Sequence, residues 1–551
     1  MATLKQLTET ILQKKRAALQ MGGEDEIVKQ RSQGKLTVRE RIDILFDPGT
    51  FNEIGILAVG AGTGERQFAP TEDKPTPGDG VVAGYGNVNG RKVGVIAYDF
   101  TVIAGTIGEV NERKADRMRE MALVGRFPLV WLLDSAGARI QEIASSKFAM
   151  TGKLFHDQVR LSGVVPQVAA MMGPCAAGTA YIAGLADFVP MVKGTSSMAL
   201  AGPPLVKAAI GEDISAEDLG GSKVHCSISG VGDLEVAGDE ECIRVVKKYL
   251  SYFPSHSGEK PPGGGGGADK ASMEDRLARA MTGEEGGADR IEDSILEILP
   301  ESSLKIYDMR KVIEKIIDDA GSAGAAGSAG AGDFLEIKPN FGKGLITALA
   351  RIGGWSVGIV ASQPAYMGGV INIDESDKAA RFINLCDAFN IPLVYLQDVP
   401  GFMVGSKVEK QGIIRHGAKM LFATCRATVP KITIIIRKAY GAGYYVMCGK
   451  AFGADLVAAW PSAEISLMGA EGAVNIIFRK EIQKAADPEK KKKELIDEYR
   501  NRIALSMAAE GAYIDDVIDP RDTRRVIVEA LRITANKKLE NPEKKHGVMP
   551  V

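Results

Sequence analysis

The sequence predicts an α/β protein built from two similar halves, and three observations support this prediction. Short apolar runs, typical of buried strands, alternate with longer helical patterns. A long stretch of the chain occurs twice, and each copy is followed by turns rich in Gly and Ala. Alternating strands and helices are the pattern of a sheet whose strands are buried by helices.

The strand and helix patterns come in the same order in both halves. In the first half the apolar runs are "VGVIAY", "PLVWLLD" and "QVAAMM", with a helical stretch at 109–124. In the second half they are "VGIVAS", "PLVYLQD" and "KITIIIR", with a helical stretch at 374–389. Ligands of such folds bind at the carboxyl ends of the strands, so the loops after these runs are expected to carry the chemistry.

The repeat is direct enough to indicate an internal duplication. Residues 90–137 align with 354–401 at a constant offset of 264, without a gap, and 15 of the 48 aligned positions are identical. The two similar halves therefore lie near 28–258 and 296–530. Identical pairs include Gly105 and Gly369, Lys114 and Lys378, Arg117 and Arg381, Asp134 and Asp398, and Gly137 and Gly401.

Composition shifts mark the domain boundaries. We predict an N-terminal domain at 1–258, a Gly/Pro-rich and then charged linker at 259–295, and a C-terminal domain at 296–551. Within the later domain, "AGSAGAAGSAGAG" (320–332) has no counterpart in the first half. We expect it to be a flexible surface insertion.

The turns after the matching strands contain almost no reactive side chains. "DSAGARIQE" (134–142) and "GPCAAGTAY" (173–181) follow strands of the first half, and "DVPGFMVG" (398–405) and "RKAYGAGYYVM" (437–447) follow those of the second. Small residues let a backbone approach a ligand closely, and the first N–H groups of a helix lack internal partners. Such N–H groups suit a developing negative oxygen. The purely structural alternative is that small residues only allow tight packing of strand and helix.

Other motifs indicate structure rather than chemistry. Asp134 and Asp398 end strands, where an Asp more often caps a turn than acts in catalysis. Cys175 has the position of a nucleophile, but its counterpart in the second half is Ala439, which favours a packing role. "LDSAG" lacks the leading Gly of a nucleophile elbow, and no GxxxxGK[ST] occurs.

Composition excludes several classes of function. The chain has 551 residues, 45% of them hydrophobic, and a formal net charge of −2, so no charge excess suggests nucleic-acid binding. No apolar run approaches the roughly 18 residues of a membrane span. The six cysteines form no CxxC pair, so neither a zinc site nor a disulfide framework is predicted. The N-terminus resembles neither a signal nor a transit peptide, and we expect a cytoplasmic location.

Ordered motifs over nearly the whole chain resemble the carboxyltransferase (beta) subunits of biotin-dependent acyl-CoA carboxylases. This family includes propionyl-CoA and methylcrotonoyl-CoA carboxylases and methylmalonyl- and glutaconyl-CoA decarboxylases. The resemblance implies two tandem crotonase-like domains, the first for acyl-CoA and the second for carboxybiotin. The matching stretches include "GKLTVRERIDILFDPGTF", "DFTVIAGTIGE", "DSAGARIQE", "GPCAAG", "DVPGF", "GIIRHGAKMLFA" and "KAYGAG".

The resemblance implies that backbone N–H groups form two oxyanion holes. The residues implied for the thioester oxygen are Gly137, Ala138, Ala177 and Gly178, and those for the ureido oxygen of biotin are Gly401, Phe402, Gly441, Ala442 and Gly443. Ala136, Arg139 and Tyr445 are expected to contact the substrate, and no metal is expected. Ala136 departs from the DSGGAR of many relatives.

The resemblance also implies partners. Biotin would arrive on a separate carrier protein or domain, charged by a biotin carboxylase subunit, and the chain would assemble as a homo-oligomer, expected to be a hexamer built as a trimer of dimers. No nucleic acid and no membrane insertion are expected.

The acyl group and the direction of transfer stay open. "GAGYYVMCG" is similar to methylcrotonoyl-type subunits, whereas "GIIRHGAK" is similar to propionyl-type ones. The alternatives are a decarboxylase working in reverse, a crotonase-type hydratase or hydrolase using Glu142, and a non-catalytic CoA-binding scaffold.

Overall fold

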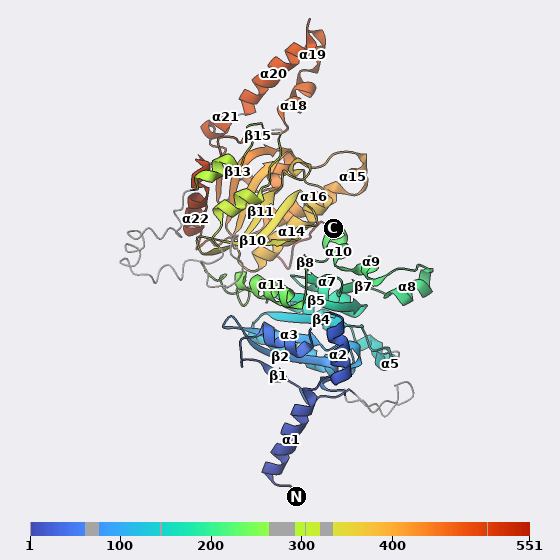
Figure 1. Ribbon diagram of the computed structural model, residues 1–551. Coiled ribbons are helices and arrows are strands. Elements are labelled where there is room, and N and C mark those ends of the chain that lie inside the picture. The colour runs from blue at the N-terminus through green and yellow to red at the C-terminus, as the bar shows by residue number, and fades with distance from the viewer. Residues whose placement is uncertain are drawn as a thin grey trace, which may run out of the picture. The chain divides into compact units, whose positions relative to one another are not determined.

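The computed structural model describes residues 2–60, 76–143, 146–263, 292–302, 305–319, 334–503 and 505–550. The chain divides into two compact units, Met1–Glu259 and Lys260–Val551 (Figure 1). Most of the predicted linker (264–291) and the whole predicted insertion (320–332) lie outside the described residues.

The first unit contains an eight-stranded sheet. Its strand order is β1-β2-β3-β4-β5-β6-β8, and β7 pairs with β5. β1, β2 and β3 are antiparallel to one another, and all later pairings are parallel. The strands are β1 (Asn52–Ile54), β2 (Val81–Val88), β3 (Arg91–Tyr98), β4 (Leu129–Ser135), β5 (Gln167–Ala176), β6 (Pro190–Val192), β7 (Ser197–Ala199) and β8 (Leu234–Val236).

The second unit repeats this sheet strand for strand. Its order from the antiparallel edge is β9-β10-β11-β12-β13-β14-β16, and β15 pairs with β13. Leu393 pairs with Lys431 as Leu129 pairs with Gln167, so the register also keeps the offset of 264. The predicted α/β fold with an internal duplication is confirmed. The strands are β9 (Phe334–Ile337), β10 (Leu345–Ile352), β11 (Trp355–Ser362), β12 (Leu393–Val399), β13 (Lys431–Tyr440), β14 (Leu456–Ala459), β15 (Glu464–Ser466) and β16 (Asp516–Val517).

Helices connect the strands in both units, and Figure 1 shows α1 projecting from the sheet of the first unit. The helices of the first unit are α1 (Leu4–Ala18), α2 (Glu24–Ser32), α3 (Val38–Leu45), α4 (Glu109–Gly125), α5 (Ile140–Ile143), α6 (Lys153–Leu161), α7 (Gly178–Leu185), α8 (Pro203–Ile210), α9 (Ala216–Gly220), α10 (Ser222–Val224) and α11 (Asp239–Tyr252). Those of the second are α13 (Arg310–Ile316), α14 (Ile373–Ala388), α15 (Ser406–Lys410), α16 (Ile413–Arg426), α17 (Gly441–Val446), α18 (Ala470–Ile477), α19 (Arg479–Lys484), α20 (Pro488–Ile503), α21 (Leu505–Glu510) and α22 (Thr523–Ile533).

The sequence explains why the central strands lie where they do. Every residue of β4 and of β12 is buried, which matches their continuous apolar runs and is typical of parallel strands covered on both faces. Helix α3 begins at a capping box in which the Thr37 hydroxyl accepts from the backbone of Glu40, and the Glu40 side chain accepts from the backbone of Thr37.

Two buried lysines occupy matching places in the two units. Lys114 on α4 donates to the carbonyls of Gly78 (3.1 Å) and Val81 (2.5 Å). Its counterpart Lys378 on α14 donates to carbonyls before and at the start of β10, at 2.7–3.0 Å from those of Lys338, Phe341 and Leu345. Burial lowers the pKa of Lys114 to about 8 and that of Lys378 to about 7. Each lysine side chain therefore ties its helix, α4 or α14, to the turn that precedes β2 or β10.

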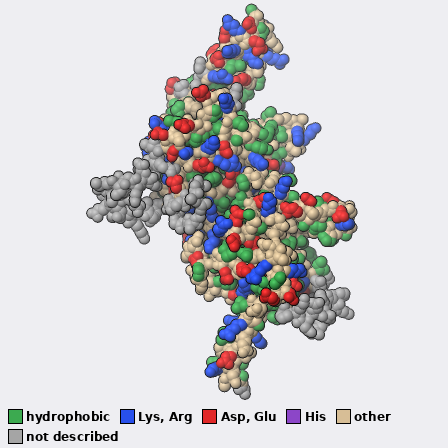
Figure 2. Space-filling view, in the orientation of Figure 1, with side chains coloured by type: hydrophobic (Ala, Val, Ile, Leu, Met, Phe, Trp, Pro, Cys, Tyr) green, Lys and Arg blue, Asp and Glu red, His purple; other side chains and the backbone are tan. Residues whose placement is uncertain are grey.

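Charged side chains of both signs are interspersed over the face drawn in Figure 2. Among the described helices, none combines the length and the apolar character needed to cross a membrane.

Candidate functional site

In the first unit the turns that follow β4 and β5 touch each other. Gly137 has a φ of +97°, and a Cβ built on it would lie 2.9 Å from the carbonyl oxygen of Ala176. Any side chain here would strain the backbone and press on the neighbouring turn, so Gly is required. The two turns predicted to form one site are therefore brought together.

Hydrogen bonding distinguishes the four predicted donors of this first site. The N–H of Gly137 donates to the Ser135 hydroxyl (3.1 Å), and the N–H of Ala177 donates to the Ala199 carbonyl (3.0 Å). The N–H groups of Ala138 and Gly178 have no acceptor within the described part of the chain. Ala138 and Gly178 are thus the donors available to a ligand.

The Ala138 amide is held in place from both sides. Ile107 donates to the carbonyl of Gly137 (2.9 Å) and accepts from the N–H of Arg139 (2.8 Å). This short parallel bridge fixes the plane of the intervening peptide. Gly178 is the first residue of α7, where an N–H has no intrahelical acceptor.

The second unit repeats this arrangement at the offset of 264. Ile371 donates to the carbonyl of Gly401 (3.1 Å) and accepts from the N–H of Met403 (2.8 Å), so Phe402 takes the place of Ala138. Ala442 on α17 takes the place of Gly178. Neither N–H has an acceptor in the described residues. The counterpart of Ser135 is Val399, which offers no hydroxyl to the N–H of Gly401.

The turns at the start of α7 and α17 share an unusual backbone. Ala177 has a φ of +55° and its counterpart Gly441 has a φ of +54°. A Cβ on Gly443 would lie 3.1 Å from the Cα of Gly401, so the small residue allows the two turns of the second site to approach. Positive φ at Ala177 is costly for a residue with a Cβ. A strained turn with the same geometry in both units indicates that the turn itself is needed.

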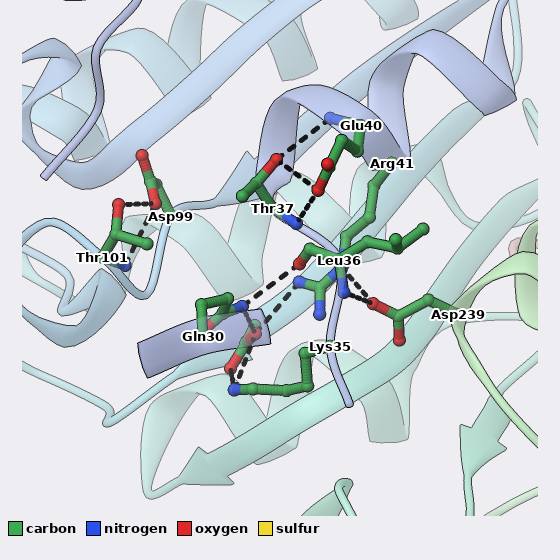
Figure 3. Close-up of polar contacts among 10 residues, drawn as sticks. Gln30, Lys35, Leu36, Thr37, Glu40, Arg41, Asp99, Thr101 and Asp239 are labelled. Carbon is green, nitrogen blue, oxygen red and sulfur yellow. Dashed lines mark hydrogen bonds and ion pairs between the residues drawn. The ribbon is translucent and has the colours of Figure 1, made fainter. Parts of the chain in front are cut away.

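Asp134 lies in a buried ion-pair network rather than in a catalytic position. Its carboxylate accepts from Lys35 Nζ, Arg41 Nη1 and Gln30 Nε2, each at 3.0 Å. Figure 3 shows Gln30, Lys35 and Arg41 converging from the N-terminal segment, with Arg41 also bound to Asp239 (2.7 Å). The interpretation of Asp134 as structural fits these contacts.

Asp398 is held differently from its counterpart. It pairs with Arg437 Nε (2.9 Å) and accepts from the N–H of Lys438 (3.1 Å). Burial raises the pKa of Asp398, against the opposing effect of the Arg437 charge. The counterpart of Arg437 in the first unit is Gly173, where a Cβ would lie 1.8 Å from an Asp134 carboxylate oxygen. Each Asp therefore has a buried cationic partner, supplied by different parts of the fold.

Cys175 is buried on β5, beside Ser135 of β4. Burial raises the pKa of its thiol to about 12. Because the thiolate is the nucleophilic form, Cys175 is a poor nucleophile at neutral pH.

The three residues expected to contact substrate lie in different surroundings. Ala136 is exposed, and its N–H donates to the Ala104 carbonyl (3.0 Å). Tyr445 is half-exposed on α17 and stacks on Phe452, with ring centroids 5.1 Å apart. Arg139 is buried, and its guanidinium pairs with carboxylates of the protein.

Sequence reasoning missed the residues that hold the donors in place. Ile107 and Ile371 supply the bridges, Ser135 and Ala199 occupy two of the predicted N–H groups, and Asp79 pairs with Arg139. The identity of Ile107 and Ile371 in the duplicated alignment was the one signal that could have found them. No group of three or more His, Cys, Asp or Glu side chains in the described residues is arranged to hold a metal ion.

Comparison with known proteins identifies the family to which the chain is similar. The family model described as the carboxyl transferase domain matches residues 29–549. The chain is 44% identical to the methylmalonyl-CoA carboxyltransferase 12S subunit of Propionibacterium freudenreichii subsp. shermanii, over 100% of this chain and 98% of that protein. It is 41% identical to the propionyl-CoA carboxylase carboxyltransferase subunit of Haloferax mediterranei, over 100% of both.

Among solved structures, the chain resembles a transcarboxylase 12S hexamer with methylmalonyl-coenzyme A and methylmalonic acid bound. The TM-score is 0.88 and the identity 42%, over 100% of this chain and 99% of that one. The predicted fold of two crotonase-like domains is confirmed by this likeness.

Proposed function

The chain belongs to the carboxyl transferase domain family, and we propose from this membership and from the free N–H groups how it acts. It is a biotin-dependent acyl-CoA carboxyltransferase. The observation that carries the proposed mechanism is the matched pair of unoccupied backbone donors in each unit, Ala138 with Gly178 and Phe402 with Ala442.

In the first unit, the N–H groups of Ala138 and Gly178 hold the thioester oxygen of the acyl-CoA. Loss of the α proton, or of the α carboxyl group, places negative charge on this oxygen as an enolate. Two N–H groups aimed at the oxygen stabilise that charge more than the neutral carbonyl, which lowers the barrier. Gly137 and Ala177 shape the turns so that these donors converge.

In the second unit, the N–H groups of Phe402 and Ala442 hold the ureido oxygen of biotin. Gly401, Gly441 and Gly443 give the backbone the conformation and the clearance that this requires. Bound carboxybiotin would supply the carboxyl group and a ring nitrogen able to exchange the α proton. The chain then needs no catalytic acid or base of its own, which fits the lack of reactive side chains in the turns.

We propose methylmalonyl-CoA and propionyl-CoA as the substrate pair. The names of the two relatives given above support this choice. The small, exposed side chain of Ala136 is proposed to border the acyl group bound by the first unit.

The same likeness supports an assembly. The related 12S protein is a hexamer with methylmalonyl-CoA bound, and we propose a hexamer for this chain, with a biotin carrier and a biotin carboxylase as partners.

A hydratase or hydrolase of the crotonase type fits the structure less well. Both carboxylate oxygens of Glu142 are engaged, one by Arg139 Nη1 (2.6 Å) and the other by the N–H of Glu109 (2.8 Å). A carboxylate held in this way is poorly placed to act as a general acid or base on a ligand.

The test is transfer from carboxylated thioesters to free biotin by the purified chain. Malonyl-, methylmalonyl-, methylglutaconyl- and glutaconyl-CoA are compared, and carboxybiotin formation is followed. We expect the highest kcat/KM with methylmalonyl-CoA. Transfer from another thioester would overturn the proposed substrate, and no transfer to free biotin or to a biotinylated carrier would overturn the proposed function.

A further inference from the structure

The two units differ at the residue that follows the free donor beside each isoleucine bridge. Ala138 is followed by Arg139, whereas Phe402 is followed by Met403. The backbone bonds to Ile107 and Ile371 are the same in both units, so the difference lies in the side chains. A residue that is charged at this position in only one of the two duplicated units calls for a local reason.

In the second unit the donor residue anchors itself. A Cβ built on Gly417 of α16 would lie 3.0 Å from Cε1 of Phe402, so the Phe402 ring packs closely on the helix backbone. Ala138 has only a methyl group and cannot reach a neighbouring helix in this way. Beyond the backbone bonds to Ile107, the adjacent side chain of Arg139 can supply such an anchor.

Arg139 uses every nitrogen of its guanidinium for contacts within the protein. Nη1 pairs with Asp79 Oδ1 (2.8 Å) and Glu142 Oε1 (2.6 Å). Nη2 donates to the Thr106 carbonyl (3.2 Å), and Nε donates to the Thr106 hydroxyl (3.3 Å). The side chain of Arg139 is 8% exposed and that of Asp79 is fully buried. Every nitrogen of the fork therefore has an acceptor within the protein.

Asp79 is itself rigidly held. It lies in a turn in which Gly78, Asp79 and Gly80 all have positive φ, and its carboxylate accepts from the N–H of Asn111 (2.9 Å). The Asn111 side chain donates to the carbonyls of Asp79 (2.7 Å) and Thr106 (2.8 Å). Arg139 thus ties the Ala138 segment to the turn before β2 and to the start of α4.

We infer that Arg139 and Asp79 are positioning residues that fix the Ala138 N–H for the enolate oxygen. This inference rests on the proposed function and replaces direct contact of Arg139 with the acyl-CoA. An oxyanion-hole donor stabilises charge only when its direction is fixed before the reaction, so loosening it acts on the transition state rather than on substrate binding.

The test measures kcat and KM for methylmalonyl-CoA with free biotin as acceptor. R139M introduces the residue that the second unit uses, and we expect kcat to fall about 10- to 100-fold, with KM changed less than about threefold. R139K keeps the charge but not the fork, so we expect only partial recovery. The matched control is R524M, which removes a similarly buried arginine paired with Asp318 in the other unit and is expected to lower the melting temperature while kcat stays within about twofold.

A double variant separates positioning from folding. R139M leaves Asp79 buried without its cation, which costs stability. In D79N/R139M that charge is gone, so we expect the melting temperature to recover while kcat stays low.

Recovery of kcat in the double variant would show a merely structural role and overturn the inference. A rise in KM with unchanged kcat in R139M would show direct substrate contact and overturn it as well. Failure of the wild-type chain to transfer at all would instead overturn the proposed function.

Discussion

Ala177 and Gly441 show which backbone conformation the site requires of a single residue. Both adopt nearly the same positive φ, +55° and +54°, but only one of them is Gly. The first unit therefore tolerates strain at the residue before its free donor. Strained backbone of this kind persists only where the surrounding structure over-determines it.

This strain gives a prediction with an internal control. A177G should raise the unfolding free energy by about 1 kcal/mol, because Gly adopts this φ without a Cβ penalty. G441A should lower it by a similar or larger amount, since its Cβ would lie 3.0 Å from the Leu467 carbonyl. Urea unfolding midpoints of the two variants check this, and a destabilised A177G would contradict the account.

Cys175 gives a second prediction at this scale. The thiol lies beside the first site, but its pKa is raised to about 12 by burial. C175A should therefore keep kcat within about threefold of the wild type, with at most a modest loss of stability from the small cavity. Loss of transfer in a folded C175A protein, or rapid inactivation by a thiol alkylator at pH 8 of the wild type but not of C175A, would indicate a chemical role instead.

Single residues can be predicted from sequence where identity alone decides their role. The alignment of Cys175 with Ala439 favours packing, because a small side chain without reactive chemistry fills the matching position in the second half. The occupation of the Gly137 N–H by the Ser135 hydroxyl could not be predicted, because it depends on the rotamer and the local turn. The cations on Asp134 come from Lys35 and Arg41, which lie 99 and 93 positions away in the chain, and no local pattern reveals them.

At the scale of elements, the duplicated lysines connect helix and turn in both units. Lys378 is enclosed by backbone carbonyls, and its pKa is lowered to about 7. In an unfolded chain a lysine titrates near pH 10.4. Between these values the unfolded chain binds more protons at this position, so stability rises with pH across this window.

We therefore expect Lys378 to contribute a pH dependence that its replacement removes. The melting temperature of the wild type should rise relative to that of K378M between pH 7 and pH 9.5. K378M should be less stable at both pH values, since four backbone carbonyls lose a hydrogen bond from this side chain, at about 1 kcal/mol each. K311M, at an exposed lysine of α13, is the control. Parallel pH profiles of the wild type and K378M would contradict this role.

The elements themselves were largely predictable. The strands "PLVWLLD" and "PLVYLQD" became β4 and β12 because continuous apolar runs suit strands that are buried on both faces. The short strands β7 and β15 were not predicted. Their three residues carry no clear period, yet β7 provides the Ala199 carbonyl that occupies the N–H of Ala177.

At the scale of the whole molecule, the duplication fits the proposed chemistry. Transfer of a carboxyl group involves two oxyanions, one on the thioester and one on the ureido ring. In the proposed mechanism, two copies of one turn geometry provide a donor pair for each oxyanion. The first pair, Ala138 and Gly178, is supported by a charged side chain, whereas the second is supported by an aromatic one.

The repeat could be predicted from sequence because its offset is constant through the strands. The narrowing of the four predicted donors of the first unit to two free ones, Ala138 and Gly178, could not be predicted, because it rests on which backbone groups are already hydrogen-bonded. The domain roles and the assembly stay predictions.

The most direct test of this account compares G178A with G178P in methylmalonyl-CoA to biotin transfer. A Cβ on Gly178 would meet only Phe155 Cζ at 3.5 Å, and Pro is tolerated at the first position of a helix; melting temperatures of both variants establish that they fold. Only G178P lacks the N–H. We predict that G178A keeps kcat within about threefold and that G178P loses about 10²- to 10³-fold. Equal kcat values in two folded variants would contradict the claim that backbone donors carry the reaction.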